Sequence, residues 1–227
     1  DSLWLDQITR AISHELRASS RHVKSMTQLL AMTQADESSD ASREYLQSLG
    51  SAADVLQARV EAIDWFFGLA AGEFEFAPAS LADALESALS DISFEIANAR
   101  SELHVAGEAA GVPLDVDSDR LRQVFAALIR NSLKFCDTPV RVSVSFEQSH
   151  DSVEMVITDS GPGFDAATPG NAFAMFKRFH GAEVPGLGVG LAAVAAVVKR
   201  HRGSVAIASS SEAGTTVTLT FPLPPNS

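Results

Sequence analysis

The sequence has little cysteine, few basic residues and no long apolar run, and each shortage excludes a class of protein. Cys136 is the only cysteine among 227 residues, so no disulfide can form within the chain. We interpret it as a small apolar filler rather than a reactive thiol. Lys and Arg number 17 against 29 Asp and Glu, and the formal net charge of −12 argues against a nucleic-acid-binding surface. No stretch approaches roughly 18 consecutive apolar residues, and no signal segment opens the chain, so we predict no membrane segment.

The residues that are present predict a folded, globular protein. Apolar residues make up 46% of the chain and charged residues 20%, and the length suffices for one large or two modest domains. We expect a soluble piece compatible with the cytoplasm, whose partner is a small anion in a local pocket or another protein. The chain begins within a helical pattern at Leu3-Trp4-Leu5, and we therefore expect a longer parent protein.

The first 70 residues predict two long helices. Apolar residues recur at steps of three and four, and five polar residues, 36–40, separate the two runs. The second run forms a heptad seam, so two helices of about 30 residues would make an antiparallel hairpin. Such a hairpin cannot bury its stripe alone. We predict a homodimer through residues 1–70; packing of the hairpin on the rest of its own chain is the alternative. The first run is Leu5, Ile8, Ile12, Leu16, Val23, Met26 and Leu30, and the second is Leu46, Leu49, Ala53, Leu56, Val60, Ile63, Phe67 and Ala70.

From residue 72 the pattern changes to mixed α and β. We predict helices at residues 81–99, with Ser80 as N-cap, at 119–135 and from about 190 to 202. The predicted strands are residues 73–76, 102–105, 113–116, 140–146, 153–158, 204–208 and 215–221.

His14 lies in the first helical run but off its apolar stripe. At about 100° per residue it is about 200° from Ile12, so we expect it to face solvent beside Glu15. Two interpretations are open at this point: an ordinary histidine on a charged helix face, or a reactive group.

Two glycine-rich segments of the second part are candidate ligand sites. Asp159-Ser160-Gly161-Pro162-Gly163 follows a predicted strand, which places a carboxylate beside backbone that a flat ligand can approach. That carboxylate can accept from an exocyclic amine, although the segment alone is also a common turn. Gly186-Leu187-Gly188-Val189-Gly190-Leu191 precedes a helix, where backbone N–H groups can bind an anion. The segment matches neither the Walker pattern nor the dinucleotide fingerprint.

Asn131 and Lys134 lie three residues apart and share one face of the predicted helix 119–135. An amide oxygen can ligate Mg²⁺, and an ammonium can pair with phosphate. Read alone, an exposed polar face explains the pair as well. Together with the two glycine-rich segments, the pair favours a binding site.

In this order, the motifs resemble those of the sensor histidine kinases of two-component signalling, over nearly the whole chain. Ile12-Ser13-His14-Glu15-Leu16-Arg17 resembles the phosphoacceptor box, and residues 121–135, with Asn131-Ser132-Leu133-Lys134-Phe135, resemble the asparagine box. The segments that begin at Asp159 and Gly186 resemble the two glycine boxes, and Phe173-Ala174-Met175-Phe176-Lys177-Arg178 resembles the phenylalanine box between them. Arg178-Phe179-His180 is most similar to the kinase cores attached to phytochrome-type photosensors.

The resemblance implies a fold, an activity and a set of roles. Residues 1–71 would be the helical hairpin that becomes a four-helix bundle as a dimer, and residues 72–227 an α/β two-layer sandwich of GHKL ATPase type that binds Mg-ATP. His14 would attack the γ-phosphate, with Glu15 orienting it or accepting its proton. The phosphoryl group would pass to an aspartate of a response regulator, under control of an upstream sensor domain. For the nucleotide, the resemblance implies that Asn131 binds Mg²⁺ and that Lys134 and Arg178 bind phosphates. It implies that Asp159 accepts a hydrogen bond from the adenine amine. The glycines that would shape the pocket and its lid are Gly161, Gly163, Gly186, Gly188 and Gly190.

Two departures from the family pattern bear on this interpretation. Ala18-Ser19 stands where the family often has Thr-Pro, which puts phosphatase activity in doubt. Ala127 replaces a further Asn often found one turn before Asn131. One rival is therefore a histidine phosphotransfer or docking protein with a degenerate ATP-binding domain. A second rival is an ATPase of the same superfamily that works as a conformational clamp.

Overall fold

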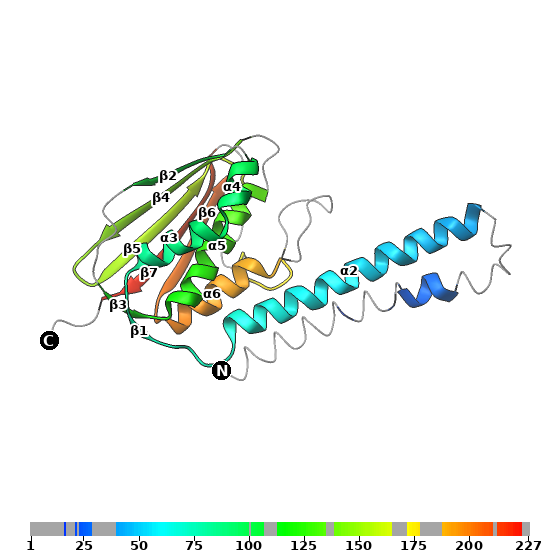
Figure 1. The fold of residues 1–227 in the computed structure, drawn as a ribbon, viewed down its shortest axis with the longest axis horizontal. Helices are drawn as coiled ribbons and strands as arrows, with labels where there is room; N and C mark the ends of the chain where they lie inside the picture. Colours follow the sequence, from blue (N-terminus) through cyan, green and yellow to red (C-terminus); the bar gives the residue numbers. More distant parts are fainter. Residues whose placement is uncertain are drawn as a thin grey trace. The chain divides into compact units, whose positions relative to one another are not determined.

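In the computed structural model the described residues are 16, 21, 23–28, 40–99, 101–106, 113–134, 139–164, 172–177, 188–210 and 213–223 (Figure 1). The chain divides into two compact units, residues 1–65 and residues 66–227. His14, Glu15, Cys136, Arg178 and Gly186 lie outside the described residues.

The first unit is helical wherever it is described. Residues 16, 21 and 23–28 are helical, and Leu16, Val23 and Met26 of the predicted stripe are half-buried. Helix α2 spans Asp40–Ala70, which confirms the second predicted helix. Along its seam, Leu46 remains 56% exposed and Val60 43% exposed. No helix in the described part of the chain is long and apolar enough to cross a membrane.

The second unit contains a five-stranded sheet. Its order is β2 (Glu102–Ala106), β4 (Arg141–Gln148), β5 (Ser152–Asp159), β7 (Gly214–Pro222) and β6 (Ser204–Ser210). Strands β2 and β4 are parallel, whereas every other neighbouring pair is antiparallel. Buried and less buried residues alternate along β4 and β5, because side chains of a strand point to opposite faces in turn. The sheet therefore has one core face.

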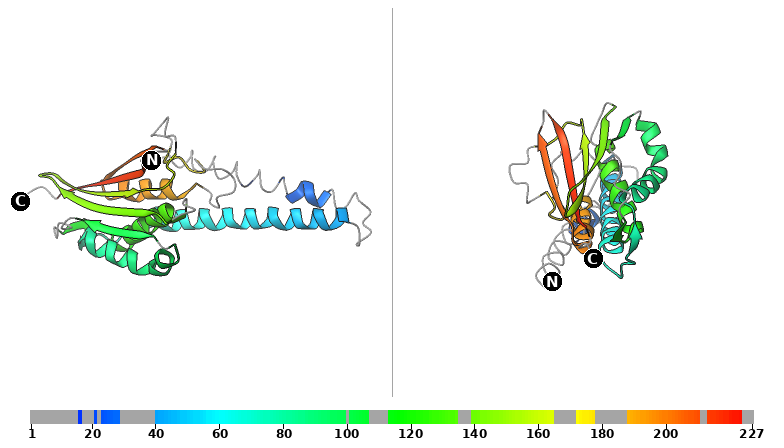
Figure 2. Two further views of the ribbon diagram at one scale, coloured as in Figure 1. Left: turned by 90° about the horizontal axis from the view of Figure 1, so that it is seen from above. Right: turned by 90° about the vertical axis from the view of Figure 1, so that its left-hand side faces the viewer.

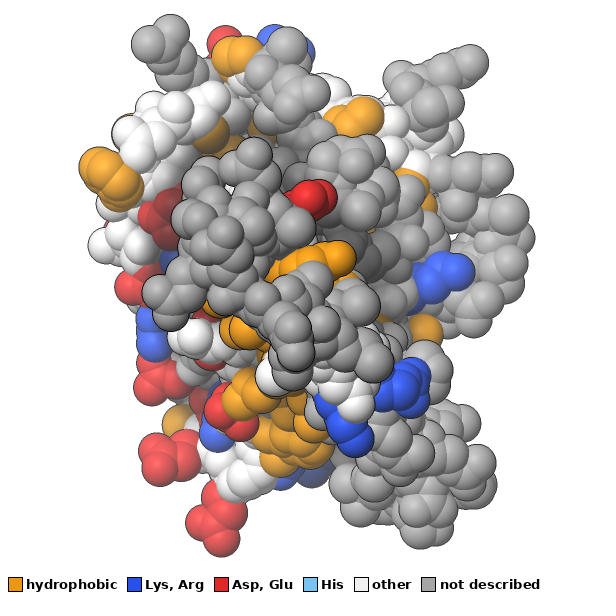
Figure 3. All heavy atoms as spheres, turned by 90° about the vertical axis from the view of Figure 1, so that its right-hand side faces the viewer, with side chains coloured by type: hydrophobic (Ala, Val, Ile, Leu, Met, Phe, Trp, Pro, Cys, Tyr) orange, Lys and Arg blue, Asp and Glu red, His pale blue; other side chains and the backbone are white. Residues whose placement is uncertain are grey.

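Helices cover that core face and form the second layer (Figure 2). They are α3 (Leu81–Asp91), α4 (Ser93–Ala99), α5 (Ser118–Lys134) and α6 (Gly190–Arg200). Helix α5 supplies the largest apolar stripe, and α6 adds small residues that allow close packing: Leu121, Val124, Phe125, Leu128 and Ile129, then Ala193, Val194 and Val197. The two-layer α/β sandwich expected from the sequence is confirmed. Acidic and basic side chains both occur on the face drawn in Figure 3, with no continuous basic surface among the residues described there.

Two predicted elements differ from the structure. The strand expected at residues 73–76 is wrong: the strand is β1 (Ala77–Ala79), which pairs antiparallel with β3 (Leu114–Val116). Glu75 N–H instead donates to Asp117 Oδ2 at 3.0 Å, so this backbone group has a side-chain partner rather than a ladder partner. The single helix expected at residues 81–99 is broken at the fully buried Ile92, the C-cap of α3, although Ser80 caps its start as predicted.

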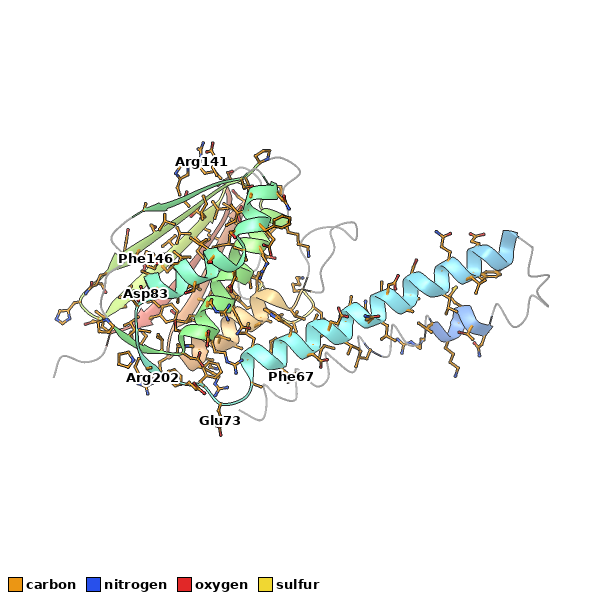
Figure 4. All side chains as sticks on the ribbon, in the orientation of Figure 1. Phe67, Glu73, Asp83, Arg141, Phe146 and Arg202 are labelled. Atoms are coloured by element: carbon orange, nitrogen blue, oxygen red, sulfur yellow. The ribbon has the colours of Figure 1, made fainter. Side chains whose placement is uncertain are left out.

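A charged and aromatic cluster fixes the segment that follows α2. Arg120 donates to the carbonyls of Gly68 and Leu69, and Arg200 donates to those of Ala70 and Gly72. Both guanidinium groups lie over the ring of Phe74, at 5.2 Å for Arg120 and 3.7 Å for Arg200. Cations that bind the last carbonyls of a helix favour its negative end. Figure 4 shows the neighbouring Glu73 pointing away from this domain.

Candidate functional site

Asp159 is the last residue of β5, and its carboxylate is held by three neutral donors. Its Oδ1 accepts from the backbone N–H of Gly161 at 3.0 Å and from that of Thr215 at 3.2 Å. Its Oδ2 accepts from the hydroxyl of Ser132 at 2.9 Å. The donors come from the turn after β5, from β7 and from α5, so three separate elements fix the side chain. Asp159 stays half-buried and can still be reached by a ligand.

The contact between Ser132 and Asp159 ties α5 to the end of β5. Asn131 precedes Ser132 on α5 and is half-buried, and Lys134 is exposed one turn later. Through this contact, Asn131 is one residue away in the chain from the side chain that meets Asp159. Within the described part of the chain, no hydrogen bond of the Asn131 side-chain amide is seen.

Two of the predicted glycines are required by backbone geometry. Gly163 has φ +57°, and a Cβ there would lie 1.9 Å from the carbonyl oxygen of Ser210. Gly188 has φ +68°, and a Cβ there would lie 2.3 Å from the carbonyl oxygen of Lys177. Both conformations strain a residue with a side chain. At Gly190 a Cβ would meet nothing within 4 Å, so the described surroundings do not require a glycine there.

The start of α6 has the properties of an anion site. Its N-cap, Val189, makes no side-chain capping hydrogen bond, and its first turn contains no acidic residue. The N-terminal N–H groups of a helix carry partial positive charge when no side chain satisfies them. Just before α6, the Gly188 carbonyl accepts from Phe176 N–H at 2.9 Å. A phosphate group would fit the chemistry of this end of α6.

The protein groups available to coordinate a metal fit a magnesium ion that is bound mainly by water and by the phosphates of a substrate. Within the described ranges no group of three or more His, Cys, Asp or Glu side chains could hold a metal ion. Mg²⁺ commonly uses only one or two protein ligands together with water and substrate phosphates. A single amide oxygen, that of Asn131, is compatible with such a site.

The structure adds residues to the site that the sequence analysis missed. Ser132 and Thr215 hold the Asp159 carboxylate, and Gly214 passes so close that a Cβ there would lie 2.0 Å from the Asp159 carbonyl oxygen. Ser209 supports the same region, because its hydroxyl accepts from Phe164 N–H at 2.9 Å. The glycine at 214 was the one available signal, since it stands between two predicted strands.

Residues 116–225 match the family described as histidine kinase-, DNA gyrase B- and HSP90-like ATPase. This part of the chain, just under half of it, is therefore similar to the ATPase domains of that family. Among curated relatives, the heme sensor protein HssS of Staphylococcus saprophyticus is 30% identical over 120 residues, covering 53% of this chain and 26% of the relative. The phytochrome-like protein Cph1 of Synechocystis is 22% identical over 213 residues, covering 93% of this chain and 28% of the relative. The chain thus spans about a quarter of each relative's length.

Solved structures of histidine kinases share the fold. One is histidine kinase ThkA in complex with the response regulator protein TrrA. The superposition covers 97% of the present chain and 62% of the matched chain, with a TM-score of 0.65 and 14% sequence identity. Another is full-length ShkA in complex with AMPPNP. The superposition covers 92% of the present chain and 45% of the matched chain, with a TM-score of 0.60 and 20% sequence identity. Together with the family match and the curated relatives, they confirm the resemblance to a sensor histidine kinase core; relatives of phytochrome type are among those found.

Proposed function

We propose that the chain is an ATP-dependent protein-histidine kinase core, which phosphorylates its own His14 and passes the phosphoryl group to an aspartate of a response regulator. The observation that carries this proposal is the Asp159 carboxylate, fixed by three neutral donors at a strand end of an ATPase-family domain. An acceptor fixed in this way suits the exocyclic amine of adenine.

The remaining site residues would bind the triphosphate. The uncapped start of α6 offers N–H donors, and Lys134 and Arg178 offer cationic side chains. Mg²⁺, when bound at Asn131, neutralises charge on the phosphate oxygens. Gly163 and Gly188 let backbone approach closely where a side chain would not fit. Positioning and charge neutralisation therefore form this domain's whole contribution to phosphoryl transfer.

His14 would supply the covalent chemistry. A neutral imidazole nitrogen forms a bond to the γ-phosphorus as the bond to the β–γ bridging oxygen breaks, and ADP leaves with that oxygen. The proton released by the imidazole passes to Glu15 or to water. The phosphoramidate is then the donor to the response regulator's aspartate. The ThkA structure, crystallised with a response regulator, supports a partner of this class. Control by an upstream sensor domain and a cytoplasmic location remain predictions of the sequence.

The proposal is tested by incubating the purified chain with Mg²⁺ and ATP labelled at the γ-phosphate. We expect label that is acid-labile and alkali-stable, as a phosphoramidate is, and that disappears in His14→Ala. A matched control is His22→Ala, eight residues further along the same predicted helix, which should still be labelled. Transfer is then measured by adding receiver domains to the labelled chain, with acceptor-aspartate variants of those domains as controls.

Other outcomes of this experiment favour the rivals. Label that persists in His14→Ala would contradict the assignment of the phosphoacceptor. ATP turnover without labelled protein would favour the clamp ATPase. A calorimetric titration that detects no ATP binding would favour the phosphotransfer protein with a degenerate domain, for which Ala127 is the one supporting feature.

We also propose that the helical part dimerises into a four-helix bundle. Leu46 and Val60, on the predicted seam of α2, are exposed in the single chain, and an exposed heptad seam is typical of a helix that packs against another. We expect light scattering to give twice the 24.0 kDa chain mass. Leu46→Asp should shift the mass toward that of one chain, whereas Gln47→Asp, next to it on α2, should not. A monomeric wild-type chain at micromolar concentration would contradict the proposal.

A further inference from the structure

Ser132 is one of three buried polar or charged residues in the described core, at 8% exposure, and its hydroxyl points at the candidate base-reading carboxylate. The hydroxyl lies 2.9 Å from Asp159 Oδ2 and 3.5 Å from the carbonyl of Leu128 on the preceding turn. The shorter contact is a charge-assisted hydrogen bond, and the longer one is at the limit for a hydrogen bond. The hydroxyl therefore donates to Asp159.

The lone-pair positions on the Asp159 carboxylate determine how the Ser132 hydroxyl affects ligand binding. A carboxylate offers about four lone-pair positions, two on each oxygen. Both positions of Oδ1 are taken, by the backbone N–H groups of Gly161 and Thr215. Among the described residues, Ser132 is the one donor to Oδ2. A ligand amine that binds Asp159 must therefore use the same oxygen as Ser132.

We infer that Ser132 is a positioning residue that sets the direction of the one remaining acceptor position on Asp159 and thereby selects bases with an exocyclic amine. This inference rests on the proposed function and deepens it. With Ser132 donating to one lone pair of Oδ2, the other lone pair points in a fixed direction, toward a ligand donor. A base with a carbonyl oxygen at that position would place one hydrogen-bond acceptor against another, Asp159 Oδ2, so no hydrogen bond could form.

The effect of removing the hydroxyl follows from this geometry. In Ser132→Ala, Asp159 keeps both donors to Oδ1, so the carboxylate stays near β5. Its Oδ2 loses the fixed donor, and its orientation toward the amine is no longer determined. The hydrogen bond from the ligand amine to Oδ2 is then weakened rather than lost, which we expect to lower affinity by roughly five- to tenfold. We expect that loss only for ligands that use Oδ2.

The test is a calorimetric titration of the full chain with two nucleotides: ATP, and the triphosphate of purine riboside, which lacks the 6-amino group. Wild-type protein should bind the analogue at least about tenfold more weakly than ATP, because Asp159 then lacks its ligand donor. Ser132→Ala should bind ATP about five- to tenfold more weakly but bind the analogue within about twofold of wild type. This difference between the two nucleotides would not arise from a merely structural role.

Ser149→Ala is the matched control. Ser149 lies in the turn between β4 and β5, at the opposite end of β5 from Asp159, and its hydroxyl accepts from Asp151 and Ser152 N–H. We expect it to change neither affinity. If Ser132→Ala does not fold, Ser132→Cys, which keeps the size with a weaker donor, should show the same selective loss.

Equal weakening of both nucleotides in the Ser132 variant, or no weakening of either, would overturn the inference and leave the proposed function intact. A wild-type chain that bound ATP and the analogue equally would overturn the role of Asp159 in reading adenine, and with it the inference. The two failures are therefore distinguishable.

Discussion

Asp117 directly follows β3 and Asp159 ends β5 in the same domain, yet the protein surrounds them differently. Asp117 is 6% exposed, accepts from the backbone N–H groups of Glu75 and Arg120, and pairs with the Arg120 guanidinium at 3.8 Å. Asp159 is half-buried, and its three donors are neutral; no Lys or Arg of the described ranges pairs with it. One carboxylate is enclosed with a cation, and the other keeps an acceptor position for a ligand.

The difference fits a structural role for Asp117 and the binding role that we propose for Asp159. An ion that is buried with its partner contributes to stability only while both are present, because removing one leaves an uncompensated charge. A carboxylate held by neutral donors keeps its charge available for a ligand donor. Asp117 also donates its own N–H to His201 Nε2 at 3.0 Å, so it fixes a second buried side chain. We therefore expect substitution at the two aspartates to have opposite consequences.

The largest expected effect is the loss of ATP binding in Asp159→Asn. The new Oδ1 can still accept from Gly161 and Thr215, and the new Nδ2 can donate to the Ser132 hydroxyl, so the fold should persist. The second hydrogen of Nδ2 would then face the adenine amine, donor against donor. We expect ATP affinity to fall by about a hundredfold or more and the free energy of unfolding to change by less than about 1 kcal/mol. Calorimetry and urea unfolding measure the two quantities.

Asp117→Asn is the matched partner of that experiment. Its amide keeps one acceptor oxygen but loses the charge that faces Arg120 and the second oxygen that accepts from Glu75. We expect the domain to lose about 2 kcal/mol of stability and to keep its ATP affinity within about threefold. A stable Asp117→Asn protein that no longer bound ATP would contradict the structural role expected for Asp117 and the binding role proposed for Asp159.

A smaller, pH-dependent effect is expected at His201, which lies beside Asp117. Burial lowers the pKa of His201 below 6.5, although the carbonyl of Val197 and the carboxylate of Asp117 act in the opposite direction. Nε2 accepts from Asp117, so Nδ1 carries the hydrogen and donates to Val197 at 2.8 Å. The unfolded chain therefore binds a proton more readily than the folded one. The contribution to stability is complete above pH 6.5 and is lost as pH falls from 6.5 through the folded pKa.

The measurement is the melting temperature at pH 7.5 and pH 5.5. We expect wild-type protein to lose more stability on acidification than His201→Gln, whose amide can accept from Asp117 and donate to Val197 without titrating. His104→Gln is the control, because His104 is exposed on β2. If acidification destabilised wild type and His201→Gln equally, His201 would not be the titrating group.

The sequence predicted the layered fold because that fold depends on local pattern, and a local pattern also made Asp159 a candidate. Alternating apolar residues specified β4 and β5, and Asp159 stands where β5 meets a glycine turn. The same pattern could not distinguish Asp159 from Asp117, which also ends an apolar run. Their roles depend on partners far away in the chain, 84 residues for His201 and 56 for Thr215. Only the tertiary structure brings these partners together.

Dependence on partners far away in the chain also explains the wrongly predicted strand at residues 73–76. Residues 73–76 alternate as a strand would, but Phe74 and Phe76 pack on His201, and Glu75 N–H bonds to Asp117. Ser132 was not predicted as a site residue because Leu128 and Ile129, its neighbours on the same face of α5, are apolar, whereas its polar partner lies 27 residues away. The periodicity of a helix or strand shows which face is buried. It does not show which distant side chain that face meets.

The most direct test combines the two aspartates with the phosphoacceptor. Wild type, Asp117→Asn, Asp159→Asn and His14→Ala are incubated in parallel with Mg²⁺ and ATP labelled at the γ-phosphate. We predict acid-labile label on wild type and Asp117→Asn, and none on Asp159→Asn or His14→Ala. Undiminished label on Asp159→Asn would contradict the assignment of this carboxylate as the group that holds the nucleotide.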